Sequence, residues 1–274
     1  MMNRFNLVYV LKRSLDKLLS SFRLYQALIN SCLFSGGDPF VDREAQDDAT
    51  ANAIKKIRKK RLNGPSISAI YRVKNAEVYL ESSLLSVAPL VKEVIIIDNM
   101  STDNTLGIAR RLKAELAPIL RIEVYSYGQR LELAGEGYLE RVEANKEGSL
   151  AKFYNYCFSL GTADYLLKVD AHYIFTIKGL LSLQKQVGKG ADIIYYRGCE
   201  IYGKALSVEP HCFRRAINFQ YIDSDRFEIL KIEDDQGLVK KFIFSPAFLH
   251  LKRISYSKHL MKSQKPLYSL YGKS

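Results

Sequence analysis

The chain has 274 residues, of which 47% are hydrophobic and 26% are charged, so it is neither a disordered nor a fibrous protein and can bury one large core. Lysine and arginine number 41 against 29 acidic residues, which gives a net charge of +12, and no acidic residue follows Asp235. This excess of positive charge suits a partner that carries phosphate, such as an anionic membrane surface, a nucleic acid or a nucleotide.

The four cysteines lie far apart in the sequence and form no C-x-x-C pair, which argues against a zinc knuckle and against a disulfide framework. No run of about 18 apolar residues occurs, and the N-terminus lacks the apolar core and cleavage site of a signal peptide. We therefore expect a protein of the reducing cytoplasm that is not secreted and does not span a membrane.

Residues 4–33 place apolar side chains at helical spacing, with lysine and arginine on the remaining arc. Such a helix either lies in the interface of an anionic membrane or packs its apolar face on the main domain. A second basic cluster, at 54–61, is typical of a solvated linker helix. The expected organisation is a basic helical extension (1–64), a main domain (65–252) and a basic tail (253–274).

Beyond residue 65, strand-like and helix-like patterns alternate. Short β-prone or continuous apolar runs predict strands, and apolar residues at helical spacing predict the helices between them, with Asn75 as the N-cap of the first. The predicted strands are 67–73, 91–98, 121–125, 164–170, 192–196 and 242–252. The first predicted helix has Leu80, Leu84 and Val87 on one face and ends at Pro89, the second has Ile108, Leu112 and Leu116 on one face and ends near Pro118, and the third covers 150–160. This order predicts an α/β domain with a mostly parallel central sheet flanked by helices.

Two of the predicted strands end in a carboxylate, at Asp98 and at Asp170, and the second is followed by His172. In a parallel sheet both would lie at the carboxyl edge, where ligands bind, together with Arg72 and Asn99. No G-x-G-x-x-G and no P-loop motif is present, which argues against a dinucleotide oxidoreductase and a P-loop kinase. A phosphate ligand would then need a metal ion, and carboxylate with imidazole favours Mn²⁺ over Mg²⁺.

Three segments carry a resemblance to a known family: I-S-A-I-Y-R-V-K-N (67–75), I-I-D-N-M-S-T-D-N-T (96–105) and K-V-D-A-H (168–172). In this order they resemble the three signatures of family 2 glycosyltransferases of the GT-A fold, and the second is the most specific. Two later segments, 209–214 and 248–252, resemble parts of bacterial capsule and lipopolysaccharide transferases. The resemblance implies a Rossmann-like GT-A domain with a nucleotide-sugar half (65–175) and an acceptor half (176–252).

The resemblance also implies roles for the residues that match the signatures. Arg72 and Val73, with Asn75 close by, would line the nucleoside pocket of a donor such as a UDP-sugar, Asp98 would support its loop, and Asn99 would face the base.

Asp170 and His172 stand at the D-x-D motif, whose first carboxylate approaches the ribose or sugar and whose last residue binds Mn²⁺ or Mg²⁺. Histidine here departs from the family pattern and removes one negative charge, which leaves open a metal-free site or a purely structural His172.

Inverting members of the family use a carboxylate downstream of this motif as general base. The E-D-D turn favours Asp234, with Glu228 and Glu209 as alternatives, although most acidic residues in such turns are simply solvated. The implied activity is transfer of a sugar from a nucleoside diphosphate to a polysaccharide or lipid-linked acceptor of a surface glycan. The basic termini would hold the enzyme on the inner face of the membrane.

Three other readings are weighed against this one. A sugar-nucleotide pyrophosphorylase would carry a glycine-rich phosphate loop, which is absent. A catalytically silent GT-A-like module would bind a nucleotide or serve as a scaffold, with His172 as the mark of lost metal binding. A nucleic-acid-binding protein would need a reader motif or aromatic residues interleaved with the basic cluster 54–61, and neither is found.

Overall fold

The computed structural model describes residues 43–200, 205–233 and 236–251. The predicted helix at 4–33, the tail from 253 and Asp234 lie outside these residues. The helices are α3 (Arg43–Asn63), α4 (Leu80–Val87), α5 (Thr105–Leu116), α6 (Tyr138–Ala144), the 3₁₀-helix η1 (Lys146–Gly148), α7 (Leu150–Ser159) and α8 (Ile177–Gly188). The strands are β1 (Ile67–Val73), β2 (Glu93–Asp98), β3 (Arg121–Ser126), β4 (Tyr165–Val169), β5 (Tyr173–Phe175), β6 (Ile193–Tyr196), β7 (Gly198–Glu200), β8 (Glu209–Arg214), β9 (Phe219–Asp223), β10 (Glu228–Ile232), β11 (Lys240–Phe242) and β12 (Phe248–His250).

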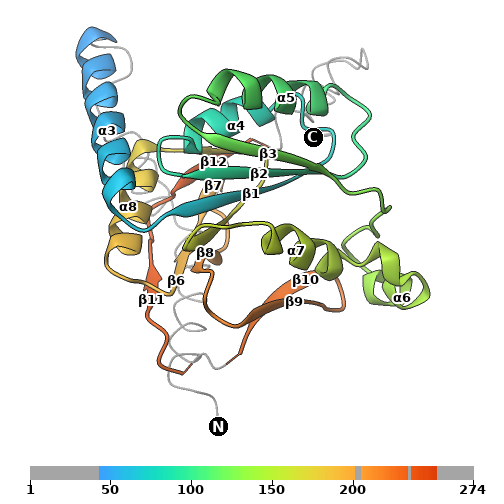
Figure 1. Cartoon of the computed structure of the whole chain (residues 1–274). Coiled ribbons are helices and arrows are strands. Elements are labelled where there is room, and N and C mark those ends of the chain that lie inside the picture. Colours follow the sequence, from blue (N-terminus) through green and yellow to red (C-terminus); the bar gives the residue numbers. More distant parts are fainter. Residues whose placement is uncertain (1–42, 201–204, 234–235, 252–274) are drawn as a thin grey trace, which may run out of the picture.

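A seven-stranded sheet in the order β11-β6-β8-β4-β1-β2-β3 forms the centre of the molecule (Figure 1). β1 pairs in parallel with β2 and β4, and β2 pairs in parallel with β3, whereas β8 is antiparallel to both β4 and β6. A smaller sheet, β5-β12-β7, and the hairpin β9-β10 lie beside it. The predicted α/β class with a mostly parallel sheet is therefore confirmed.

Helices cover both faces of the central sheet, α4 and α5 on one and α7 on the other (Figure 1). Along β1, Ala69, Tyr71 and Val73 join the core under α4 and α5, while Ile70 joins the core under α7 with Phe158. This alternation follows from the two-residue period of a strand. It also directs Arg72, one position after Tyr71, towards α7.

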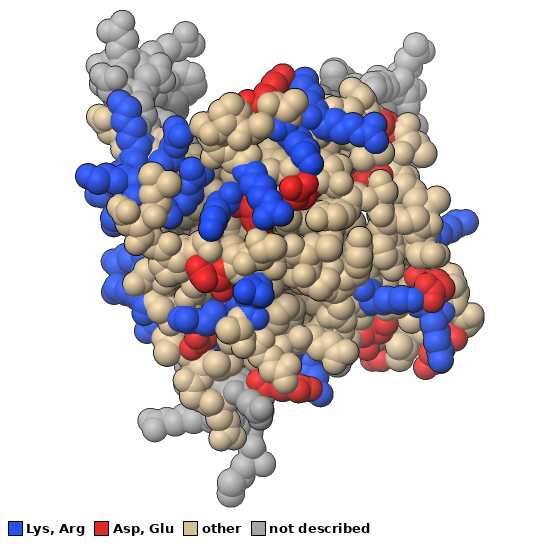
Figure 2. Space-filling model, in the orientation of Figure 1, with Lys and Arg blue, Asp and Glu red and all other residues tan. Residues whose placement is uncertain are grey.

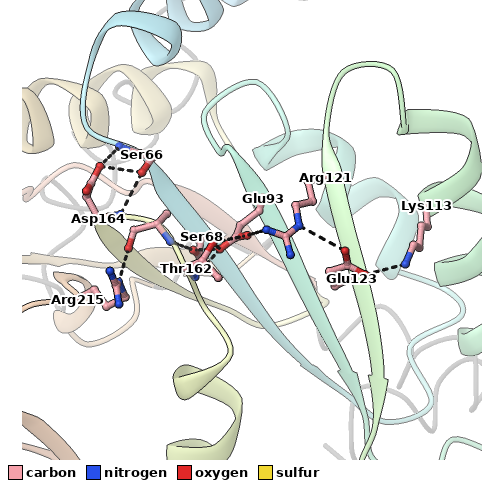
Figure 3. A network of polar contacts seen from close by, with 10 residues as sticks. Ser66, Ser68, Glu93, Lys113, Arg121, Glu123, Thr162, Asp164 and Arg215 are labelled. Atoms are coloured by element: carbon pink, nitrogen blue, oxygen red, sulfur yellow. Dashed lines mark hydrogen bonds and ion pairs between the residues drawn. The ribbon is translucent and has the colours of Figure 1, made fainter.

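At the amino ends of the parallel strands, a network of hydrogen bonds and ion pairs surrounds the buried carboxylate of Glu93 (Figure 3). Glu93 accepts hydrogen bonds from the hydroxyl of Ser68 at 2.5 Å and from the backbone N–H of Thr162 at 2.6 Å, and it forms an ion pair with Arg121 at 3.4 Å. Burial alone would raise the pKa of Glu93, but these hydrogen bonds lower it, so the group is charged at neutral pH. The network joins β1, β2, β3 and the segment before β4.

The predicted strand at 67–73 agrees with β1, and the predicted ends of α4 and α5 agree with the structure within about two residues. Two helices, α6 and α8, go beyond the predicted elements. Asn75 is not the N-cap of α4, as predicted, because that helix begins after Tyr79 and Asn75 adopts a left-handed conformation with φ 53°. None of the described helices is long and apolar enough to cross a bilayer.

Candidate active site

The carboxyl ends of β4, β1 and β2 lie side by side and bring the predicted site residues to one edge. Val73 is in register with Asp98, and Tyr71 is in register with Val169, the residue before Asp170. Asp98 and Asp170 thus flank β1 on opposite sides, at a separation of two strands, or roughly 10 Å. The prediction that both carboxylates share an edge is confirmed.

An ion pair between Arg72 and Asp170 lies at the centre of this edge. The Arg72 side chain is only 4% exposed, pairs with Asp170, and stacks on Tyr154 of α7 with 4.1 Å between its Cζ and the ring centroid. Burial would raise the pKa of Asp170, but the positive charges of Arg72 and Lys168 outweigh it and hold the pKa well below its usual range. Asp170 is therefore ionised at neutral pH.

Asp98 carries a buried acceptor oxygen that has no hydrogen-bond partner among the residues that the structure describes. The residue is 3% exposed, and its Oδ2 accepts from the backbone N–H of Ser101 at 3.2 Å, whereas Oδ1 is buried and makes no hydrogen bond. A buried carboxylate oxygen without a donor is costly, by about 1–3 kcal/mol or more. A ligand hydroxyl or N–H reaching Oδ1 would remove that cost.

Asn99 is held by the loop that follows β3. Its Nδ2 donates to the carbonyl oxygens of Tyr127, at 3.1 Å, and of Gln129, at 2.7 Å. With both amide hydrogens used in this way, Oδ1 is the atom that Asn99 can offer to a ligand as an acceptor.

Asn75 joins the loops after β1 and β2 to each other. Its Oδ1 accepts from the backbone N–H of Thr102 at 2.8 Å, and its own N–H donates to the hydroxyl of Ser101 at 2.8 Å. The next residue continues the connection, since the N–H of Ala76 donates to the hydroxyl of Thr105 at 2.7 Å. Much of the D-N-M-S-T-D-N-T signature is thus engaged in hydrogen bonds within the protein.

His172 follows Asp170 in the turn to β5 and meets a second imidazole. β12 pairs antiparallel with β5, and the rings of His172 and His250 have centroids 4.6 Å apart with an interplanar angle of 80°. Among the described residues, no three His, Cys, Asp or Glu side chains are grouped so that they alone could hold a metal ion. His172 thus lies close in sequence to Asp170 and next to the imidazole of His250.

β8 brings a further acidic and imidazole pair to the site. β8 runs antiparallel to β4 with Leu167 opposite Cys212, so Glu209, at the start of β8, lies at the same edge as Asp170. Glu209 is half-buried and accepts from the Ser207 hydroxyl at 2.8 Å. Of the other predicted candidates, Glu228 lies opposite Asp223 in the β9-β10 hairpin, and Asp234 lies outside the described residues.

His211, two residues after Glu209, is a site residue that the sequence analysis did not single out. It is 3% exposed, its Nδ1 makes no hydrogen bond, and the ring of Tyr196 lies 4.8 Å from its own ring. Burial lowers the pKa of His211 from 6.5 to about 4, so the imidazole is neutral at pH 7. The alternating E-P-H pattern in a strand was the available signal.

Stability is expected to fall between pH 6.5 and pH 4 because of His211. In this window the unfolded chain binds a proton at this histidine that the folded chain excludes, so the free energy of unfolding decreases as pH falls, by up to about 3 kcal/mol for such a pKa difference. Equilibrium unfolding in urea at pH 6.5 and at pH 4 measures this difference in the free energy of unfolding. His211→Gln should remove this part of the pH dependence, and an unchanged slope in the variant would contradict the assignment.

The sequence of residues 68–244 matches the model of the family described as glycosyl transferase family 2. No curated protein sequence matches the chain. Among solved structures, S. aureus TarS (residues 1–349) is similar with a TM-score of 0.48 and 16% identity over 70% of this chain and 62% of that chain. This chain thus spans less than two thirds of TarS.

Two further solved structures resemble the chain. A glucosyl-3-phosphoglycerate synthase from Mycobacterium tuberculosis, crystallised with Mn²⁺, UDP and phosphoglyceric acid, gives a TM-score of 0.44 and 17% identity over 77% of this chain and 79% of that chain. The mannosyltransferase PcManGT from Pyrobaculum calidifontis, in complex with GDP-Man and Mn²⁺, gives 0.37 and 14% over 64% and 46%. The family match extends over more than half of the chain and includes the second and third signature segments and all but the first residue of the first, so the chain belongs to glycosyl transferase family 2.

Proposed function

We propose that this protein transfers a sugar from a nucleoside diphosphate sugar, UDP-linked, to a hydroxyl of a polysaccharide or lipid-linked acceptor, with inversion at the anomeric carbon. Family membership supports the reaction class. The observation that carries the site is the buried Oδ1 of Asp98, which has no hydrogen-bond partner among the described residues and lies at the same strand edge as the Arg72–Asp170 pair. A nucleoside supplies the hydroxyl and N–H donors that such an oxygen needs.

In this proposal the donor nucleoside lies across the ends of β1 and β2. Asp98 Oδ1 accepts from the nucleoside, Asn99 Oδ1 accepts from the N–H of the pyrimidine, and Val73 and Asn75 shape the backbone around it. Arg72 acts by fixing the carboxylate of Asp170, which then accepts from the ribose or sugar hydroxyls. The pocket thereby recognises donor groups rather than phosphate alone.

The diphosphate would lie near His172 and His250, where a divalent cation can join it. Two imidazoles suit Mn²⁺ better than Mg²⁺, and diphosphate oxygens would complete the ligand set. When bound, the metal supplies Lewis-acid stabilisation of the departing diphosphate. Lys168 of β4 adds a positive charge near the same edge. Its Nζ lies 5.4 Å from the centroid of the Tyr154 ring.

The acceptor hydroxyl needs a base on the side of the sugar away from the diphosphate. Glu209 is the favoured candidate because it lies at the same strand edge as Asp170. Burial would raise the pKa of Glu209, but the neighbouring His211, Lys168 and the Ser207 hydroxyl together lower it. It is therefore ionised and able to take a proton at neutral pH. Asp234, predicted from the sequence, is the competing candidate.

Calorimetric titration with UDP tests the donor site directly. We expect UDP to bind more tightly with Mn²⁺ than without it, Asp98→Ala to lose at least tenfold in affinity with or without metal, and His172→Ala to lose the metal effect alone. Glu233→Gln, at an exposed position beyond β10, serves as control. Absence of binding for UDP and for every other nucleotide would overturn the proposal in favour of a catalytically silent module.

We also propose that the enzyme works as a peripheral protein on the inner face of the membrane, where a lipid-linked acceptor is found. The supporting observation is the charge of +12, concentrated towards both ends of the sequence. Nucleic acid is not the proposed partner, because the basic cluster at 54–61 contains no aromatic residue.

A further inference from the structure

A cleft of about 640 Å³ lies between α3 and α8, at the amino ends of β1 and β6. The catalytic edge is at the opposite end of the strands, on the order of 20 Å away for a strand of this length. The glycosyltransferase site therefore does not account for this cleft. Its volume is in the range of pockets that hold a small organic ligand.

The charged residues that line the cleft are all positive. They are Lys56, Lys59, Lys60, Arg61, Lys185 and Lys189. None of the six forms an ion pair with a described residue. The pKa of Arg61 is lowered, first by burial and second by repulsion from the positive charge of Arg58. Figure 2 shows lysine and arginine side chains gathered over α3. Holding like charges together is unfavourable unless an anion joins them.

This uncompensated charge is not general on the surface. A second cavity, of about 610 Å³ beside α5 and β3, also contains basic residues, but there Lys113 pairs with Glu123 at 2.7 Å and Arg121 pairs with the same carboxylate at 3.4 Å. The cleft between α3 and α8 has no such acid among its lining residues. The cleft between α3 and α8 therefore holds more uncompensated positive charge than the second cavity does.

The cleft is held in place by the packing of α3 on the domain. Gln184 of α8 donates to the carbonyl oxygen of Ile57 at 2.8 Å, and Ile57 is fully buried. Arg61 donates to the carbonyl oxygens of Ala88, at 3.1 Å, and Val91, at 2.9 Å. α3 is thus part of the folded domain and not the solvated linker helix that the sequence pattern predicts.

The residues that line the cleft limit the chemical class of ligand that it can bind. Ile67, Leu90 and Val187 give the cleft an apolar part, and no aromatic side chain lines it, so it lacks the stacking surface of a single-strand nucleic-acid site. In a phospholipid, the phosphate group would contact the basic residues, and the diacylglyceryl portion would contact the apolar ones. Clusters of four to eight basic residues of this kind are typical of sites for anionic lipid.

We infer that this cleft binds the phosphate headgroup of an anionic phospholipid and docks the domain on the membrane. The inference rests on the proposed peripheral location but not on the proposed transfer reaction, and it adds a defined site in the described domain to the attraction expected of the basic termini. The lipid phosphate lies among the lysines, with the glyceryl portion against the apolar wall.

The test uses the full chain and vesicles of phosphatidylcholine alone or mixed with phosphatidylglycerol, in a sedimentation assay at physiological ionic strength. Lys56 and Lys60 are one helical turn apart and line the cleft, so Lys56→Gln with Lys60→Gln should weaken binding to the anionic vesicles about 25-fold, roughly fivefold for each lysine. The matched control, Lys55→Gln with Arg58→Gln, removes two charges from the same helix outside the cleft and should cost at most a few-fold. Glutamine preserves helix propensity in both.

Equal weakening by the two double variants would overturn the inference, since it would show general attraction and no site. So would displacement from the vesicles by inorganic phosphate or glycerol phosphate at low millimolar concentration, which would indicate a free phosphate ligand, or a larger loss of DNA binding than of vesicle binding. UDP titration of the same variants separates the two proposals. The UDP affinity of both double variants should equal that of the wild type. If the wild type does not bind UDP, only the proposed function is contradicted, and the inference about the cleft stands.

Discussion

Replacing Arg72 with methionine is expected to lower the free energy of unfolding by about 3–5 kcal/mol, because it leaves the carboxylate of Asp170 without its partner in a largely buried site. The change also removes the guanidinium that stacks on Tyr154. Equilibrium unfolding in urea measures the difference. Donor affinity should fall with it, since Asp170 would no longer be fixed.

Two comparisons identify the cause. Arg111→Met breaks ion pairs with Glu81 and Glu115, whose side chains are about half exposed, and should destabilise the protein far less than Arg72→Met, because exposed ion pairs are weakened by solvent. Adding Asp170→Asn to Arg72→Met should recover part of the loss, since no unpaired charge then remains. If the double variant is less stable than the single one, the loss comes from packing and the ion-pair explanation is wrong.

Glu209→Gln is expected to reduce kcat by roughly 10²- to 10⁴-fold while UDP affinity stays within a few-fold of the wild type. Glutamine keeps the size of the side chain and its acceptor for the Ser207 hydroxyl but cannot take a proton. Steady-state kinetics of sugar transfer, or of donor hydrolysis if the acceptor is not in hand, provide the measurement. This result would identify a base that acts on the acceptor and does not bind the donor.

The variants Asp234→Asn and Glu228→Gln test the two other candidates for the general base. Asp234 was the first choice from the sequence, and Glu228 lies across the β9-β10 hairpin from Asp223. If Asp234→Asn abolishes transfer and Glu209→Gln does not, the assignment of Glu209 is wrong and the sequence-based prediction is preferred. If all three variants remain active, none of these carboxylates is the base.

The strands of the nucleotide half, β1 to β4, could be predicted because each carries its own local signal, whereas the predicted strand at 242–252 is two separate strands, β11 and β12. β2, for example, is a continuous apolar run that is buried along its whole length, as parallel strands between two layers of helices are. The edge that gathers Asp98 and Asp170 then follows from parallel pairing, which the registers with β1 confirm. Local pattern and topology together were sufficient for the nucleotide half.

The contacts within the site could not be predicted in the same way. Arg72 and Asp170 are 98 positions apart in the sequence, and nothing local to Arg72 indicates that it turns towards α7 to stack on Tyr154. Asn75 appeared to be an N-cap because its type favours that position, yet tertiary hydrogen bonds to the next loop hold it in the left-handed region instead. α3 is polar around most of its surface, and its docking depends on Ile57 and on carbonyl groups that Arg61 reaches from a distance.

The hydrogen bonds that join the loops after β1 and β2 have a consequence for the thermodynamics of donor binding. Side chains of one loop bind backbone groups of the other in both directions, from Asn75 to Thr102 and from Asp103 to the N–H of Glu77 at 3.1 Å. A loop that is already ordered loses little conformational entropy when a nucleotide arrives, so more of the interaction energy remains as affinity. A nucleoside that binds across β1 and β2 as proposed would therefore meet a pair of loops whose conformation is already fixed in the unliganded protein.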